Sequence, residues 1–138
     1  MDATIEYAVD ADLPFLVERS SEKSPDVLRR KIQAKEVIVA RLRGEVVAWM
    51  TYTLLYDVVP FINILYVVQE RRREGLGTRL VQFLESEVRK AGFRRVMTSS
   101  LSNEQGQHFW RKMGYKDVGG VLLTDEPLEV FFRKDLSP

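Results

Sequence analysis

Residues 71–77 combine positive charge with glycine, and this combination can bind a phosphate group. The segment reads Arg71-Arg72-Arg73-Glu74-Gly75-Leu76-Gly77. Glycines permit a tight turn of bare main chain, and the first amides of a following helix have no acceptor inside that helix. The helix dipole adds partial positive charge at the same place. We therefore predict a phosphate site here, with Arg72 and Arg73 as the preferred side-chain contacts, whereas Arg71 can equally well face solvent.

A glycine turn with solvated arginines is the alternative interpretation of this segment, and the flanking elements decide against it. Residues 61–68 are almost all apolar, which is typical of a central strand buried on both faces. Apolar residues then recur at helical spacing from Leu76 to Ala91, and Gly92 provides a stop. A strand that leads through glycines into a helix directs several N–H groups at one point. Residues 95–101 should return as a parallel strand.

The rest of the pattern predicts an α/β protein organised as one domain over residues 1–138. Further strands are expected at residues 5–9, 36–41, 46–55, 115–123 and 128–133, with a connector at 56–60. Helices should begin near Asp12, at Ser24, and at Ser102, where Gln105 completes a capping box. No repeat or linker divides the chain, and its length suits a single core.

Composition excludes several classes of function. The chain has 21 basic and 20 acidic residues and a net charge of +1, which argues against general affinity for nucleic acid or membranes. It has no cysteine, which excludes disulfides, thiolate metal sites and a cysteine nucleophile. His108 is the one histidine, so a His-rich metal site is also excluded, and we expect no metal. The first residues do not form a secretory signal, and no apolar run is long enough to span a membrane, so a cytoplasmic location is expected by default.

Two motifs together resemble those of the GCN5-related N-acetyltransferase (GNAT) superfamily. The first, Arg72-x-x-Gly75-x-Gly77, matches the pattern Q/R-x-x-G-x-G/A. The second is similar to N-x-x-A-x-x-(L/F)-Y-x-x-x-G-F and reads Asn103-x-x-Gly106-x-x-Phe109-Trp110-x-x-x-Gly114-Tyr115. They lie about thirty residues apart, in the expected strand and helix context. The resemblance covers nearly the whole chain and implies a mixed sheet of about seven strands flanked by four helices. It also implies that the parallel strands 61–68 and 95–101 splay apart.

The resemblance implies that the protein transfers an acetyl group from acetyl-CoA to a primary amine of an unidentified acceptor. The amides of residues 72–78 would hold the diphosphate, residues 65–67 would pair with the pantetheine, and the backbone N–H of Val67 would polarise the thioester carbonyl. The full set of residues implied for the cofactor is Leu65, Tyr66, Val67, Arg72, Arg73, Glu74, Gly75, Leu76, Gly77, Thr78, Asn103, Phe109 and Trp110. A homodimer through the last hairpin is plausible by analogy.

The general acid and the general base stay unassigned. Trp110 occupies the position where the family usually has a tyrosine, and an indole N–H is not a useful acid near neutral pH. The strand 61–68 also lacks the carboxylate that other members often use as a base. The alternative function is therefore a module of this fold that binds CoA or acetyl-CoA as a sensor or regulator and turns over weakly.

Individual side chains near these motifs carry further expectations. His108 lies two residues from Trp110, on another side of the helix, so we expect it to be exposed or structural. Asn63 should be hydrogen-bonded, because it falls within a strand expected to be buried. Glu85 falls on the polar face of the long helix. Gly106, which replaces alanine, is expected to open room near the cofactor.

Overall fold

The structure is a computed structural model that describes residues 2–20, 24–123, 125 and 127–137. These residues divide into two compact units. Unit 1 comprises Met1–Tyr52 and Ile64–Leu84, and unit 2 comprises Thr53–Asn63 and Glu85–Pro138. A single domain over the whole chain stays a prediction. The turn expected at residues 124–127 lies partly outside the described residues.

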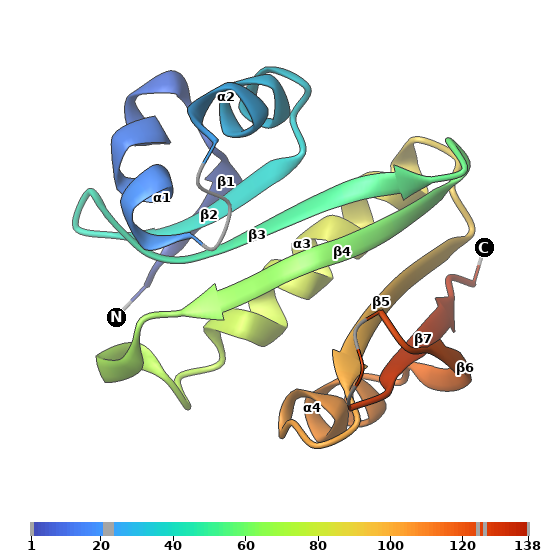
Figure 1. Cartoon of the computed structure of the whole chain (residues 1–138). Helices are drawn as coiled ribbons and strands as arrows, with labels where there is room; N and C mark the ends of the chain where they lie inside the picture. Colours follow the sequence, from blue (N-terminus) through green and yellow to red (C-terminus); the bar gives the residue numbers. More distant parts are fainter. Residues whose placement is uncertain (1, 21–23, 124, 126, 138) are drawn as a thin grey trace. The chain divides into compact units, whose positions relative to one another are not determined.

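The N-terminal segment of unit 1 contributes the first three strands and two helices, and its second segment contributes the end of β4 (Val59–Val67), η2 (Gln69–Arg71) and most of α3 (Leu76–Lys90). The elements of the N-terminal segment are β1 (Thr4–Tyr7), the 3-10 turn η1 (Asp10–Asp12), α1 (Leu13–Arg19), α2 (Pro25–Gln33), β2 (Val37–Leu42) and β3 (Glu45–Leu55). β1 pairs antiparallel with β2, and β2 pairs antiparallel with β3. The helices α1 and α2 lie next to each other beside these strands (Figure 1). The start of α2 is as expected, because the Ser24 hydroxyl accepts a hydrogen bond from the Val27 amide at 3.3 Å.

The core of unit 1 forms where the two helices meet the sheet. Leu16 comes from α1, Leu28 and Ile32 from α2, and Trp49 from β3. Each of these side chains is almost completely removed from solvent. Burial of this apolar surface is the main stabilising contribution, at about 25 cal/mol for each Å². Val37 and Val39 of β2 belong to the same core as the helically spaced Leu28 and Ile32 of α2.

A buried ion pair connects the end of β2 to the turn before α1. The Arg41 guanidinium donates to both carboxylate oxygens of Asp12 at 2.8 and 2.7 Å, and it also contacts Glu6. Burial raises the pKa of Asp12, but the hydrogen bonds from Arg41 and the Val9 amide outweigh it, and the net pKa lies below the usual value. Asp12 thus stays ionised and orders the entry into α1.

A tight turn joins β3 to β4 (Val59–Val67), within the expected connector at residues 56–60, although β4 begins two residues earlier than predicted. Tyr56 and Asp57 have φ angles of 53° and 63°, and the Val58 amide donates to the Leu55 carbonyl at 3.0 Å. Two successive left-handed residues define a type I′ turn, whose twist matches that of paired strands. Sequence reasoning missed the turn because glycine or asparagine usually occupies these positions.

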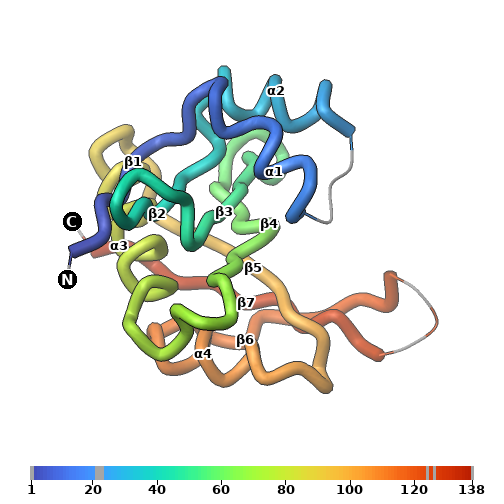
Figure 2. Tube along the Cα trace, turned by 90° about the vertical axis from the view of Figure 1, so that its left-hand side faces the viewer, coloured from blue at the N-terminus to red at the C-terminus, as the bar shows by residue number. Residues whose placement is uncertain are grey.

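Unit 2 contains the return strand and the C-terminal hairpin. Its elements include β5 (Arg95–Leu101), α4 (Gly106–Lys112), β6 (Lys116–Val121) and β7 (Glu129–Asp135). β4 pairs parallel with β5 through Phe61↔Met97 and Ile62↔Thr98, as predicted. β5 pairs antiparallel with β7, and β6 and β7 run side by side as a hairpin (Figure 2).

The described strands form one mixed sheet in the order β1-β2-β3-β4-β5-β7-β6. This order, with the four α-helices of the described residues, confirms the predicted α/β fold class. α3 (Leu76–Lys90) follows the predicted range, and Gly92 ends it with a φ of 98°. The splaying of residues 61–68 from 95–101 stays a prediction, as does the homodimer.

Two local expectations were wrong. The strand at 61–68 is not buried on both faces, because Asn63 and Tyr66 are exposed although β4 is central in the strand order. Asn63 therefore has no need of a buried partner. The capping box of Ser102 and Gln105 also does not form: Gln105 is the N-cap of α4 and makes no side-chain cap. Instead, the Gln107 side chain donates to the Ser102 carbonyl at 2.7 Å.

Candidate functional site

The chain between β4 and α3 turns through one short helical turn and two left-handed residues. The Val68 amide donates to the Val47 carbonyl at 2.9 Å, and the 3-10 turn η2 (Gln69–Arg71) follows. Arg73 and Gly75 then have φ angles of 69° and 82°. Residues with positive φ next to ordinary ones turn successive N–H groups inward, which is the geometry of anion-binding main chain.

The start of α3 presents amides ahead of the helical hydrogen-bond ladder. The Arg79 amide donates to the Gly75 carbonyl at 3.0 Å, which makes Gly75 the residue from which the ladder begins. The amides of Leu76, Gly77 and Thr78 are consequently the first three of the helix, for which the helix itself offers no acceptor. A Cβ atom built on Gly75 would meet no atom within 4 Å. Gly75 itself is thus exposed, with nothing packed over its Cα.

The four arginines in and after this loop have different contacts. The Arg72 Nε donates to the Val67 carbonyl at 2.9 Å, and the Arg72 guanidinium lies 5.3 Å from the centre of the Tyr66 ring. Arg79 donates to the Ala3 carbonyl at 2.8 Å. Arg71 lies 3.8 Å from the Glu74 carboxylate. Arg73 is exposed, and its contact with an anion stays a prediction.

Tyr66 connects this loop to the core of unit 1. Its ring centre lies 4.7 Å from that of Trp49, which is buried. The ring centre of Phe15 lies 5.6 Å from that of Trp49. The Tyr66 side chain is nevertheless 38% exposed. An aromatic ring that is fixed on a rigid strand and still open to solvent can contact a ligand, and Tyr66 belongs to the predicted cofactor set.

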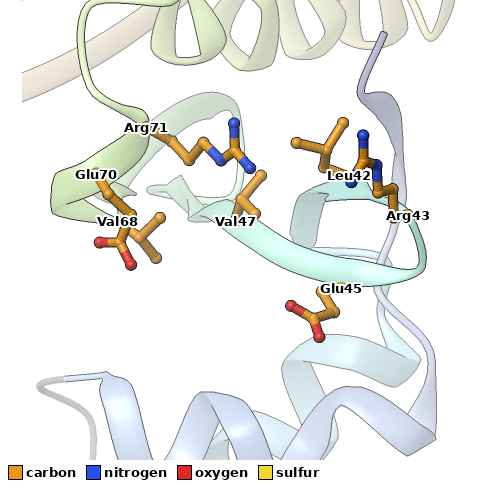
Figure 3. A pocket seen from close by; sticks show the side chains of 7 residues that line it. All are labelled: Leu42, Arg43, Glu45, Val47, Val68, Glu70 and Arg71. Atoms are coloured by element: carbon orange, nitrogen blue, oxygen red, sulfur yellow. The ribbon is translucent and has the colours of Figure 1, made fainter. Parts of the chain in front are cut away.

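A pocket of about 360 Å³ lies beside η2 and the turn between β2 and β3. Its lining residues are Leu42, Arg43, Glu45, Val47, Val68, Glu70 and Arg71. The Arg71 side chain extends over Val47, while the carboxylates of Glu45 and Glu70 are directed away from it (Figure 3). Arg71 is the only residue of the 71–78 segment in this lining, so the pocket is separate from the predicted diphosphate seat.

In unit 2, α4 packs closely on β5 because Gly106 has no side chain. A Cβ atom at Gly106 would lie 3.3 Å from the Ser100 hydroxyl oxygen, which is tighter than an ordinary contact. The expectation that this glycine opens room near a cofactor stays a prediction, although the Cβ direction itself is taken up by Ser100. Asn103 lies in the turn before α4 and is exposed, and His108 is exposed, as predicted.

Trp110 is part of the core of unit 2. It is 6% exposed, and its ring lies 5.0 Å from Phe109 and 5.2 Å from Tyr115, both edge-on. The Tyr115 amide donates to the Trp110 carbonyl at 3.0 Å, and Gly114 ends the helix with a φ of 96°. The packing interpretation of Trp110 is thus supported, and its contact with a cofactor stays a prediction.

Sequence reasoning missed a buried polar cluster in unit 2. The Tyr115 hydroxyl donates to Glu85 at 2.8 Å, and the Lys134 ammonium donates to the other Glu85 oxygen at 3.2 Å. Glu85 is buried, which corrects its placement on the polar face of α3. The available signal was its position four residues after Val81, next to the apolar stripe.

This cluster also argues against Tyr115 as a substitute acid, because its hydroxyl is buried and donates to Glu85. Burial raises the pKa of the Tyr115 phenol, and the negative charge and hydrogen bond of Glu85 raise it further. The phenol therefore keeps its proton at neutral pH and directs it to Glu85. A tyrosine that protonates a leaving thiolate needs a pKa nearer the working pH.

The structure thus places the predicted site residues in two groups. Unit 1 brings together the end of β4, the loop and the start of α3, and these hold Leu65–Val67 and Arg72–Thr78. Unit 2 holds Asn103, Phe109 and Trp110, at or near α4. Among the residues that the structure describes, no three histidine, aspartate or glutamate side chains gather as they would around a metal ion.

Comparisons with known proteins identify the family of this chain. The sequence model of the acetyltransferase (GNAT) family matches residues 5–115. The probable N-acetyltransferase 14 of Xenopus tropicalis is 35% identical over 66 residues, which cover 47% of this chain and 32% of that protein. The chain therefore spans about a third of the length of the curated relative it matches.

Solved structures share the fold at low sequence identity. The Ard1 protein of Thermoplasma volcanium superposes with a TM-score of 0.86 at 14% identity and covers 100% of both chains. The PaiA N-acetyltransferase of Thermoplasma acidophilum, solved in complex with coenzyme A, gives a TM-score of 0.83 at 17% identity, with 98% and 99% of the two chains covered.

The chain belongs to the acetyltransferase (GNAT) family, because the match extends over more than half of its length. This confirms the resemblance seen in the two motifs. No helix in the described part of the chain has both the length and the apolar composition needed to cross a membrane.

Proposed function

We propose that this protein transfers the acetyl group of acetyl-CoA to a primary amine. The observation that carries the proposal is the turn into α3, where Arg73 and Gly75 have positive φ and the first amides of the helix lie ahead of its hydrogen-bond ladder. Backbone amides and a helix dipole that converge on one open position favour a phosphate group. Arg73 adds an exposed positive charge at the same loop. The GNAT relatives crystallised with coenzyme A or acetyl-CoA support the same ligand.

The uncovered residues of β4 support the rest of the cofactor site. Tyr66 is exposed, and Leu65 and Val67 are only partly buried, although β4 is a central strand. Side chains of a central strand that are not covered by protein can contact a ligand. We assign this part of β4 to the pantetheine arm.

The chemistry that fits this chain is direct attack in a ternary complex. The amine nitrogen would bond to the thioester carbon, the carbon–sulfur bond would break, and the amine proton would pass to the leaving thiolate through water. The chain has no cysteine to form an acyl-enzyme. The Val67 amide would stabilise the developing oxyanion, a contribution worth a few kcal/mol. Orientation of the two reactants supplies much of the remaining rate enhancement.

A steady-state assay of the purified protein tests this proposal. Acetyl-CoA is supplied with a panel of small amines, amino acids and peptides that have free N-termini, and release of the free thiol is followed. We expect at least one class of amine to accelerate thiol release above the rate of hydrolysis. If no class does so, the proposal of acetyl transfer is wrong.

A second candidate, a sensor that binds CoA or acetyl-CoA with weak turnover, is favoured by one observation. Trp110 stands at the usual tyrosine position, is buried, and packs against Tyr115. Neither indole nor the Glu85-bonded phenol of Tyr115 can protonate a leaving thiolate at neutral pH. A protein that only binds the cofactor needs no such acid.

Variants at Trp110 separate the two functions. Trp110→Tyr and Trp110→Phe remove about the same volume from the core, which should cost about 1–2 kcal/mol of stability in each. They differ by one hydroxyl group. For the sensor, we expect the tyrosine variant to exceed the phenylalanine variant in kcat by tenfold or more, within the range of general acid catalysis.

For the enzyme, we expect wild-type turnover that the added hydroxyl does not increase. Thermal unfolding of both variants serves as the control, because it shows that both are folded at the temperature of the assay. Wild-type turnover equal to that of the tyrosine variant contradicts the sensor function.

A further inference from the structure

The last peptide of β4 has a defined orientation. The Val68 amide donates to Val47 on β3 at 2.9 Å. In a trans peptide, a carbonyl and the following N–H point in opposite directions, so the Val67 carbonyl points away from β3. The N–H and C=O of one residue in a strand share the same edge. The Val67 N–H therefore also points away from β3.

Arg72 donates a hydrogen bond to the Val67 carbonyl on that edge. Its Nε donates to the Val67 oxygen at 2.9 Å, and its guanidinium lies on the Tyr66 ring, 5.3 Å from the ring centre. Tyr66 in turn rests on the buried Trp49 at 4.7 Å. The Arg72 side chain thus contacts the end of β4 twice. Its Nε atom binds the Val67 carbonyl, and its guanidinium group lies over the Tyr66 ring.

We propose that Arg72 is a positioning residue that fixes the peptide group of Val67 so that the Val67 N–H stays aimed at the thioester, and that it is not a ligand of the diphosphate. This inference rests on the proposed acetyl transfer, in which the Val67 N–H is the oxyanion donor. It revises the expectation from the sequence that Arg72 and Arg73 both contact phosphate, and it leaves that role to Arg73 and the loop amides.

Two substitutions of Arg72 can distinguish a hydrogen bond from Nε from an effect of the positive charge. In arginine, Nε is bonded directly to Cδ, and in glutamine the amide nitrogen Nε2 is bonded directly to Cδ as well. Glutamine can therefore donate to the Val67 carbonyl from the same position without any charge. Lysine keeps the charge but has a carbon at that position. The positioning role and a phosphate contact thus predict opposite orders for Arg72→Gln and Arg72→Lys.

The experiment measures kcat and KM of wild type, Arg72→Gln and Arg72→Lys with two acetyl donors, acetyl-CoA and S-acetylpantetheine, which lacks the diphosphate. We expect Arg72→Gln to keep kcat within about fivefold, since it loses only the contact with the Tyr66 ring. Arg72→Lys should lose about tenfold or more in kcat, with both donors equally. The KM for acetyl-CoA should change little in either variant.

The opposite result overturns the proposal. If Arg72 binds the diphosphate, Arg72→Lys stays near wild type, Arg72→Gln raises the KM, and the loss disappears with S-acetylpantetheine. Arg73→Gln provides the contrast, because we expect its defect to appear with acetyl-CoA alone. Arg94→Gln, at an exposed arginine outside the loop, controls for the change in net charge and should match wild type.

A measurement without turnover keeps the two proposals separate. Hydrogen exchange of the Val67 and Val68 amides should be faster in Arg72→Lys than in wild type, and close to wild type in Arg72→Gln. If wild type shows no acetyl transfer, the proposed function fails while this exchange still decides the role of Arg72. Equal exchange rates in the lysine variant and wild type contradict the positioning role.

Discussion

Replacing Lys134 with methionine is expected to lower the free energy of unfolding by about 2 kcal/mol at pH 7. Glu85 is buried, and Lys134 donates to it at 3.2 Å. Removing one partner of a fully buried ion pair costs about 3–5 kcal/mol, because the other charge is left uncompensated. The Lys134 side chain is 28% exposed, so solvent already weakens this ion pair. We therefore expect a cost of about 2 kcal/mol, below the range for a fully buried pair.

Chemical denaturation of the variants measures this cost. Glu85→Gln keeps an oxygen for the Tyr115 hydroxyl but removes the charge, so the double variant with Lys134→Met should be more stable than Lys134→Met alone. Arg95→Met serves as the matched control, because Arg95 pairs with Asp135 at 3.4 Å in an exposed position. We expect that control to cost under about 0.5 kcal/mol. If the double variant is less stable than Lys134→Met alone, the loss of stability in Lys134→Met does not come from an uncompensated charge at Glu85.

Most of the fold could be predicted from the sequence, because its strongest signals are local. The helical spacing from Leu76 onward and the stop at Gly92 predicted α3, and Ser24 with Pro25 predicted the start of α2. Each depends on the residues of one segment and their immediate backbone. The β-strands were found for the same reason, within one or two residues at their ends.

The features that could not be predicted depend on tertiary context. The burial of Glu85 requires Tyr115 and Lys134, which lie in distant parts of the sequence. Tyr66 is exposed although its strand is apolar, because no other element covers it there. The residues next to Tyr66 in the sequence do not indicate this. Even the tight turn at Tyr56 and Asp57 is held by the pairing of its two strands against an unfavourable residue choice.

The candidate site divides in the same way. The loop and the start of α3 could be read from the spacing of glycines and arginines, because an anion site made of main chain needs little from the rest of the fold. The contacts of individual arginines could not be read, since Arg79 and Arg72 use their charges on main-chain carbonyls of Ala3 and Val67. The acid and base are also unassigned, because the acceptor decides which groups come near the reacting atoms.

Gly75→Glu is expected to weaken binding of coenzyme A by about a hundredfold or more. The added side chain projects from the residue directly before the first amides of α3, where a Cβ atom meets no atom within 4 Å. Its carboxylate would occupy the seat proposed for the diphosphate and repel it at short range, where local dielectric screening is incomplete. Calorimetry with coenzyme A measures the affinity directly, and Gly75→Gln separates the bulk of the side chain from its charge.

Gly44→Glu is the matched control for backbone strain. Gly44 has a φ of 83° against 82° for Gly75, and a Cβ atom at either position meets no atom within 4 Å. Any side chain in this left-handed region costs about 1–2 kcal/mol, so both variants should lose equal stability. Only the Gly75 variant should lose affinity for coenzyme A. Equal affinities in the two variants would show that no phosphate lies at the start of α3, and the proposed cofactor site would be wrong.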